Sequence, residues 1–163
     1  MAFREMFRRI LLLGLIPVAA VAFLVMEVPM ASGKVVTLFS EINGTLVNGS
    51  GSPQSGIRIE RWWRYGTEGD GESDMATTGQ DGSFFFPAIT QDSTWAGILP
   101  GTPSIKQRIT AHGPNGDVKL WFAVKNSFDA NSETGGAPAN VICRIDQEPN
   151  VDGPVFGTCR LAD

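Results

Sequence analysis

Residues 57–65 read IRIERWWRY, and the alternation in this stretch decides the fold class. Successive side chains of a β-strand point to opposite faces of its sheet. Ile57 and Ile59 mark the face that is predicted to lie against a core, and Arg61 and Trp63 share that face. The opposite face carries Arg58, Glu60, Trp62 and Arg64. Trp62 therefore needs a role other than a place in the core.

Short segments of the same kind follow one another after residue 34, separated by turn sequences such as Asp81-Gly82 and GPNG at 113–116. Strands are predicted within residues 34–48, 57–65, 75–89, 105–112, 117–125, 141–148 and 157–161. Irregular connections are predicted for residues 66–74, 90–104 and 126–140. About seven short strands with this spacing predict an all-β chain that folds as a single β-sandwich.

The alternation is clearest in residues 117–125, DVKLWFAVK. The face that is predicted to be buried carries Val118, Leu120, Phe122 and Val124. Trp121 then falls on the outer face, between Lys119 and Lys125. Phe85 likewise lies opposite Phe84 and Phe86, and is predicted to point outward.

The N-terminal segment, residues 1–33, has three arginines followed by an uncharged apolar run at residues 10–26. This order is typical of an export signal. The run is intermediate in length between a signal peptide and a membrane-spanning helix. Two alternatives follow: cleavage after Gly33, or retention of a hydrophobic helix as a single-pass anchor. Both place residues 34–163, as one domain, in the periplasm or cell envelope.

The chain has two cysteines, Cys143 and Cys159. In an exported protein an even pair predicts a disulfide, and two buried free thiols are the alternative. The bond would close a loop of about 17 residues and contribute about 3 kcal/mol in the chain-entropy picture. Two cysteines and a single histidine cannot complete a tetrahedral zinc site, so no metal is expected.

The net charge of −4 becomes more negative once the N-terminal arginines are set aside. A nucleic-acid partner is therefore not expected, because no basic stripe would neutralise phosphates. The sequence has no G-x-S-x-G, H-E-x-x-H or glycine-rich phosphate loop. Its histidine, His112, adjoins a turn. We expect no enzymatic activity and no cofactor.

The acidic stretch at residues 66–74 has carboxylates at every second position: Glu68, Asp70, Glu72 and Asp74. Clustered carboxylates can bind Ca²⁺, but the order of residues departs from that of an EF-hand loop. A solvated connection is the favoured interpretation.

The residues from Ile42 to Ile89 combine a glycine-containing strand, a glycine-rich link, a Thr-Thr pair, an Asp-Gly turn and alternating phenylalanines. The positions that form this motif are Gly44, Gly56, Thr77, Thr78, Asp81, Gly82, Phe84 and Phe86. In this motif the segment resembles the carboxypeptidase-regulatory-like (transthyretin-like) family. The chain also resembles small exported bacterial proteins with a Trp-containing strand, a Lys-containing strand and two C-terminal cysteines. The resemblance implies a non-catalytic module that braces domains, binds ligands, or serves as an adhesive or structural unit.

Trp62, Trp121 and Phe85 are thus predicted to point outward. Leaving such a ring exposed forgoes roughly 1.5–3 kcal/mol of burial energy, so a cover is expected. The cover could be the C-terminal segment held by the disulfide, or another protein. A β-bulge at Arg61 or Trp62 would instead reset the alternation. The candidate binding residues are Arg58, Trp62, Arg64, Phe85, Lys119 and Trp121.

These observations predict a non-catalytic envelope protein that binds another protein of the envelope. An immunity or accessory protein of an antibacterial secretion system is the specific version of this hypothesis. The alternatives are a carbohydrate- or surface-binding module, and a purely structural envelope protein whose aromatic side chains are all internal.

Overall fold

The computed structural model describes residues 33–93, 101–150 and 155–162, which belong to one compact unit, Ser32–Asp163. The predicted export signal or anchor, including the apolar run at 10–26, lies outside these residues. Within the described ranges, no helix combines the length and apolarity that crossing a membrane requires.

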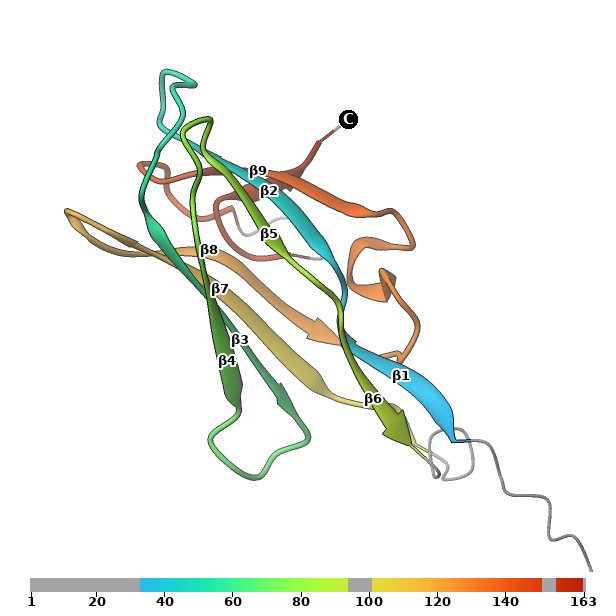
Figure 1. The fold of residues 1–163 in the computed structure, drawn as a ribbon. Coiled ribbons are helices and arrows are strands. Elements are labelled where there is room, and N and C mark those ends of the chain that lie inside the picture. Colours follow the sequence, from blue (N-terminus) through green and yellow to red (C-terminus); the bar gives the residue numbers. More distant parts are fainter. Residues whose placement is uncertain (1–32, 94–100, 151–154, 163) are drawn as a thin grey trace, which may run out of the picture. The chain divides into compact units, whose positions relative to one another are not determined.

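The described chain is all-β (Figure 1), with one short 3-10 helix, η2 (Ser132–Thr134), among its described residues. The strands are β1 (Lys34–Phe39), β2 (Ile42–Val47), β3 (Arg58–Tyr65), β4 (Glu72–Thr77), β5 (Ser83–Phe86), β6 (Ile89–Ser93), β7 (Ile105–Gly113), β8 (Gly116–Lys125), β9 (Ala139–Arg144) and β10 (Cys159–Leu161). One four-stranded sheet, here called the β3 sheet, has the order β4-β3-β7-β8. The other, the β2 sheet, has the order β10-β9-β2-β5, and β1 pairs with β6 in a separate ribbon.

The strand predictions are largely confirmed, and two regions differ. The predicted connection at 66–74 ends early, because β4 already starts at Glu72 and pairs with β3. The predicted connection at 90–104 begins with most of β6, which pairs with β1. Both strands carry many exposed polar residues and show little apolar alternation. Their strand conformation comes from backbone pairing with a neighbour, which an apolar pattern does not reveal.

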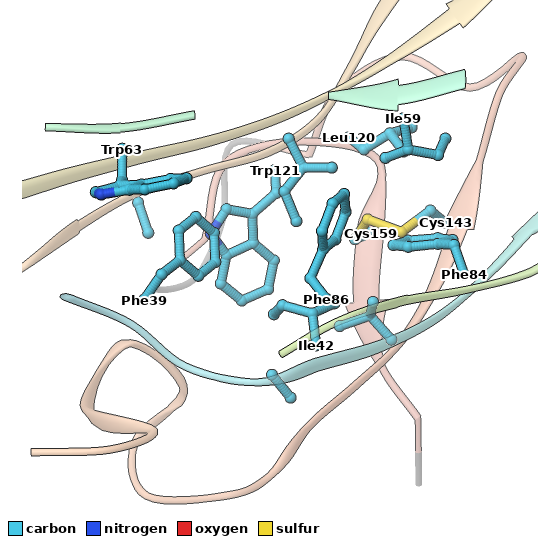
Figure 2. Packing of buried hydrophobic residues seen from close by; sticks show 14 of the residues in the cluster. Phe39, Ile42, Ile59, Trp63, Phe84, Phe86, Leu120, Trp121, Cys143 and Cys159 are labelled. Carbon is cyan, nitrogen blue, oxygen red and sulfur yellow. A yellow bond between two sulfur atoms is a disulfide. The ribbon is translucent and has the colours of Figure 1, made fainter. Parts of the chain in front are cut away.

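The hydrophobic core combines side chains from both four-stranded sheets and from β1 (Figure 2). The β3 sheet contributes Ile59, Trp63, Ile105, Ile109, Ala111, Leu120, Trp121 and Ala123. The β2 sheet contributes Ile42, Leu46, Phe84, Phe86, Ala139, Val141, Cys143 and Cys159. Gly44 is required beside this cluster, because a Cβ there would lie 2.1 Å from the Phe84 ring. The alternation predicted for residues 57–65 is confirmed, since Ile59 and Trp63 are buried and Trp62 lies on the other face.

A β-bulge in β8 corrects the orientation predicted for Trp121. Ile109 pairs with Trp121 but Thr110 pairs with Lys119, so Leu120 has no partner on β7. The extra residue turns both Leu120 and Trp121 into the core, where Trp121 is 1% exposed. Beyond the bulge the alternation is inverted: Phe122 is half-buried on the outer face and Val124 is exposed, although both were predicted to be buried.

The C-terminal segment packs beside this bulge. Phe156 forms a two-way backbone bridge with Phe122, with N···O distances of 2.6 and 2.8 Å. The next residue, Gly157, has φ +149°, and a Cβ there would lie 2.3 Å from the Leu120 carbonyl oxygen. Only glycine allows this close approach. The alternative of a bulge at Arg61 or Trp62 does not apply, because the described β3 pairings keep an unbroken register.

Arg61 lies on the core face of β3, as the alternation of residues 57–65 predicts, and its side chain is fully buried. Its guanidinium donates to both Asp74 carboxylate oxygens, at 3.0 and 2.5 Å, and to the Pro87 carbonyl oxygen at 2.5 Å. The same group lies 4.7 Å from the centroid of the Phe86 ring. A buried guanidinium is tolerated because it is both paired and hydrogen-bonded. Asp74 therefore has a structural role, in contrast to the solvated connection predicted for its segment.

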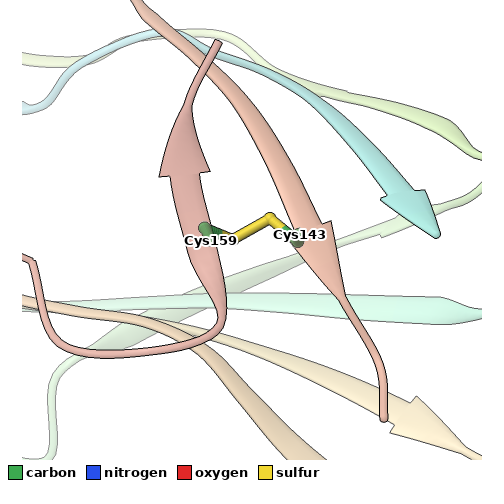
Figure 3. Close-up of a disulfide and its surroundings, with 2 residues drawn as sticks. All are labelled: Cys143 and Cys159. Atoms are coloured by element: carbon green, nitrogen blue, oxygen red, sulfur yellow. A yellow bond between two sulfur atoms is a disulfide. The ribbon is translucent and has the colours of Figure 1, made fainter. Parts of the chain in front are cut away.

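The predicted disulfide joins Cys143 and Cys159 (Figure 3). The two cysteines lie directly opposite each other on the antiparallel strands β9 and β10. The bond thus holds a three-residue edge strand, β10, to the β2 sheet. Such a short strand makes few ladder hydrogen bonds, so the covalent link adds stability where pairing alone contributes least.

Candidate binding surface

Backbone pairing aligns an aromatic and cationic row across the outer face of the β3 sheet. Trp62 on β3 pairs with Arg108 on β7, and Arg108 pairs with Phe122 on β8. Their neighbours Trp63, Gln107 and Ala123 point to the buried face, so the three paired side chains point outward. The bridge to Phe156 extends this Trp62–Arg108–Phe122 row beyond the sheet edge.

Trp62 is half-buried by contacts within the chain. The Arg108 guanidinium lies 4.9 Å from the ring centroid, and that of Arg64 lies 5.8 Å from it. The indole Nε1 donates to the Asp70 carbonyl oxygen at 3.0 Å. A Cβ on Gly71 would lie 2.6 Å from the ring, so the β3–β4 loop rests directly against it. The cover of Trp62 is this loop, and not the C-terminal segment that was one of the expected covers.

Further cations surround the row. The outer face of the β3 sheet holds Arg58, Arg64, Lys106, Arg108 and Lys119. The Lys119 ammonium lies 5.4 Å from the Phe156 ring centroid and 5.9 Å from that of Phe122. Cation–ring contacts of this kind favour defined positions for both partners. A chain with a net charge of −4 therefore presents one face with a local excess of positive charge.

Apolar side chains border the cationic face on both sides. Met75 on β4 is 52% exposed and pairs with Glu60, while Val124 on β8 is 43% exposed and pairs with Lys106. Exposed apolar groups beside tryptophan and arginine are the composition found at the centres of protein interfaces. We call the outer face of β3, β7 and β8, with Met75 at its edge, the cationic face.

The residues predicted as one binding site are divided among three places. Arg58, Trp62, Arg64 and Lys119 lie on the cationic face. Phe85, which is 52% exposed, points outward from the β2 sheet. Trp121 is in the core for the reason given above.

Sequence reasoning missed Lys106, Arg108 and Phe122 as members of the cationic face. The two cations were detectable, because residues 105–112 alternate with Ile105, Ile109 and Ala111 on the buried side. Phe122 was not detectable, because the bulge inverts its orientation.

His112 lies at one end of the cationic face, beside two carboxylates. Its Nδ1 lies 2.8 Å from Asp117 Oδ1, across the β7–β8 turn, and its Nε2 lies 3.8 Å from Glu60 Oε2. These contacts bring together a histidine and acidic residues that the sequence could not place. In the described part of the chain, no cluster of three or more His, Cys, Asp or Glu side chains could hold a metal ion.

A second group of charges is sealed inside the fold. The Lys125 ammonium lies 2.7 Å from a Glu133 carboxylate oxygen, and it also donates to the Asp129 carbonyl oxygen at 2.5 Å. The other Glu133 oxygen accepts from the Ser40 backbone N–H at 3.0 Å and from Gln107 Nε2 at 3.2 Å. The arrangement joins the loop that contains η2 to β8, β7 and the end of β1.

Burial by itself would raise the pKa of Glu133, because it disfavours the charged form. The hydrogen bonds from Lys125 and Ser40, together with the Lys125 charge, outweigh burial, and the pKa lies below its ordinary value. The carboxylate is therefore ionised in the fold. Because neither side chain of the pair is exposed, this cluster supports the architecture and does not present groups to a ligand.

Comparison with curated proteins yields no match, and comparison with solved structures yields none either. A family model described as a domain of unknown function, DUF6795, matches residues 42–148. The match runs from the first residue of β2 to just beyond β9, so it includes every strand of the β3 sheet. It covers more than half of the chain, which therefore belongs to the DUF6795 family.

Proposed function

We propose that this protein is a non-catalytic, exported envelope protein that binds an acidic protein partner through its cationic face. The observation that carries the proposal is the Trp62–Arg108–Phe122 row, flanked by four further cations on an otherwise acidic chain. Tryptophan and arginine are enriched among the residues that dominate binding energies. A positive surface also speeds encounter with a negative partner.

The export part of the proposal is supported by the disulfide and by the basic-then-apolar order of the N-terminal sequence. Disulfides persist in oxidising compartments such as the periplasm. The resemblance to the carboxypeptidase-regulatory-like family favours a non-catalytic module. In this proposal the two four-stranded sheets pack face to face as a β-sandwich, which is supported by a hydrophobic cluster that draws on both sheets.

The contacts of Trp62 support a preformed surface. Its ring is fixed by the Asp70 carbonyl oxygen, by Gly71 and by two guanidinium groups, so little side-chain freedom remains to be lost on binding. An immunity or accessory protein of a secretion system would need such a surface, because it must recognise one partner rapidly. A toxin or secretion gene beside the coding gene would support this version.

The test is affinity capture from an envelope extract, followed by binding measurements with the captured protein. We expect Arg108→Ala to weaken the complex by about 2 kcal/mol, or roughly 30-fold in Kd. Arg160→Ala is the matched control, because Arg160 is an exposed cation on β10, away from the cationic face. Association should also slow as salt is added, because the steering is electrostatic.

Equal effects of Arg108→Ala and Arg160→Ala would overturn the assignment of this face. Binding that is unaffected by salt would contradict an acidic partner. Turnover of a substrate by the purified protein, abolished in His112→Ala, would overturn the non-catalytic part of the proposal.

A further inference from the structure

The outer face of the β2 sheet contains a shallow, open hollow of about 630 Å³. Its side-chain lining includes Asn43, Thr45, Ser83, Phe85, Asn140 and Ile142. These residues come from β2, β5 and β9, and the hollow is formed on a different sheet from the cationic face.

An exposed aromatic ring and two amides form a row across this hollow. Phe85 on β5 pairs directly with Asn43 on β2, and Asn43 pairs with Asn140 on β9. All three side chains are exposed, while the neighbours Phe84 and Phe86 point into the core. Because adjacent strands lie about 4.8 Å apart, the row extends over about 10 Å.

The polar groups of the hollow are neutral, and some of their hydrogen-bond donors and acceptors are unpaired within the described residues. Asn43 Nδ2 donates to Glu41 Oε1 at 3.2 Å, which leaves the Asn43 carbonyl oxygen as an acceptor. Within the described residues, neither the Asn140 side-chain amide nor the Thr45 hydroxyl has a hydrogen-bond partner. Each amide offers donors and an acceptor side by side, and each hydroxyl offers both functions.

No charged side chain is among the residues that line this hollow. Two charged side chains adjoin the hollow: Glu41, which accepts from Asn43, and Arg160, which pairs with Ile142. The lining itself offers an ionic ligand no opposite charge. A neutral ligand with one apolar face and many hydroxyl groups would satisfy both the ring and the amides. Sugar rings have this chemistry, because their C–H groups pack on an aromatic face while their hydroxyls pair with amides.

We propose that this hollow binds a neutral oligosaccharide, with a sugar ring stacked on Phe85 and its hydroxyl groups hydrogen-bonded to Asn43 and Asn140. Thr45 and Ser83 form the polar border of the site, and Ile142 supplies apolar contact beyond the first sugar. The site is independent of the proposed protein-binding face, so either assignment can fail while the other stands.

The experiment titrates the full chain with chitotetraose, cellotetraose, maltotetraose and mannotetraose by calorimetry. Tetragalacturonate serves as the anionic comparison. We expect millimolar or tighter binding of at least one neutral sugar. Phe85→Leu keeps apolar area but removes the ring, and should weaken binding about tenfold or more, whereas Phe85→Tyr keeps the ring and should bind within about threefold of wild type.

Asn140→Ala should also weaken binding about tenfold, through the loss of hydrogen bonds to sugar hydroxyls. Trp62→Ala is the control from the cationic face and should bind sugar as wild type does. The proposal is overturned if no neutral sugar in the panel binds, if Phe85→Leu binds as wild type does, or if only the anionic sugar binds.

Discussion

The Lys125 ammonium nitrogen lies 2.7 Å from a carboxylate oxygen of Glu133, and neither side chain has any exposed area. The pair connects the last residue of β8 to the short helix η2. Asn131, the N-cap residue before that helix, has φ 59° and also donates its backbone N–H to the Ser40 hydroxyl oxygen at 2.7 Å. A loop that sequence analysis treated as irregular is therefore anchored by buried charge.

Substituting one member of this pair should destabilise the protein more than substituting both members together. Glu133→Gln leaves the Lys125 charge buried without a counter-ion, and we expect a loss of about 3–5 kcal/mol. Lys125→Met leaves the Glu133 carboxylate in the same position and should cost a similar amount. The double variant removes both charges and should be more stable than either single variant. Urea denaturation gives the four free energies of unfolding, and additive losses would contradict the expected coupling.

The same pair should make stability depend on acid pH. The pKa of Glu133 lies below its ordinary value of 4.5, so the unfolded chain binds more protons than the folded one between the two pKa values. The contribution of Glu133 to the free energy of unfolding is therefore fully present above its pKa in the unfolded chain. This contribution is lost as the pH falls through its pKa in the folded protein. Glu133→Gln lacks this dependence. The difference in unfolding free energy between wild type and Glu133→Gln should narrow as pH falls below about 4.5, and parallel profiles would contradict it.

Trp62 and Trp121 were both predicted to point outward, but substituting them should reduce the free energy of unfolding by different amounts. Trp121→Ala removes a core ring and should cost about 3–5 kcal/mol. Trp62→Ala removes a half-buried ring and should cost about 1 kcal/mol while leaving the fold intact. Chemical denaturation of both variants under identical conditions measures the contrast. Equal losses would mean that the Trp62 side of β3 is also interior.

Reducing the disulfide should destabilise the protein by about 3 kcal/mol, which corresponds to a fall in Tm of roughly 10 °C for a domain of this size. Calorimetry with and without reductant measures the change. A Cys143→Ala, Cys159→Ala double variant is the control, because its melting should not respond to reductant. An unchanged wild-type Tm after complete reduction would show that the bond does not stabilise the fold.

The local sequence pattern was sufficient to predict the strands in which apolar and polar side chains alternate and which are flanked by turn sequences. The two faces of residues 57–65 followed from their period of two, and the disulfide followed from an even number of cysteines in a chain that was predicted to be exported. At the Asp81-Gly82 turn the aspartate accepts from the Ser83 hydroxyl at 2.6 Å, and Gly82 has φ 75°. These are short-range properties that neighbouring residues decide among themselves.

Only the tertiary structure decided which residues share a surface or a partner. A single extra residue at Leu120 moved Trp121 into the core and Phe122 out of it, and nothing in the local pattern marks where a bulge occurs. Strand order placed Arg108 beside Trp62 and Phe85 on the other sheet. It also brought Lys125 and Glu133 together in the interior, because burial and pairing depend on contacts between segments that are distant in the chain.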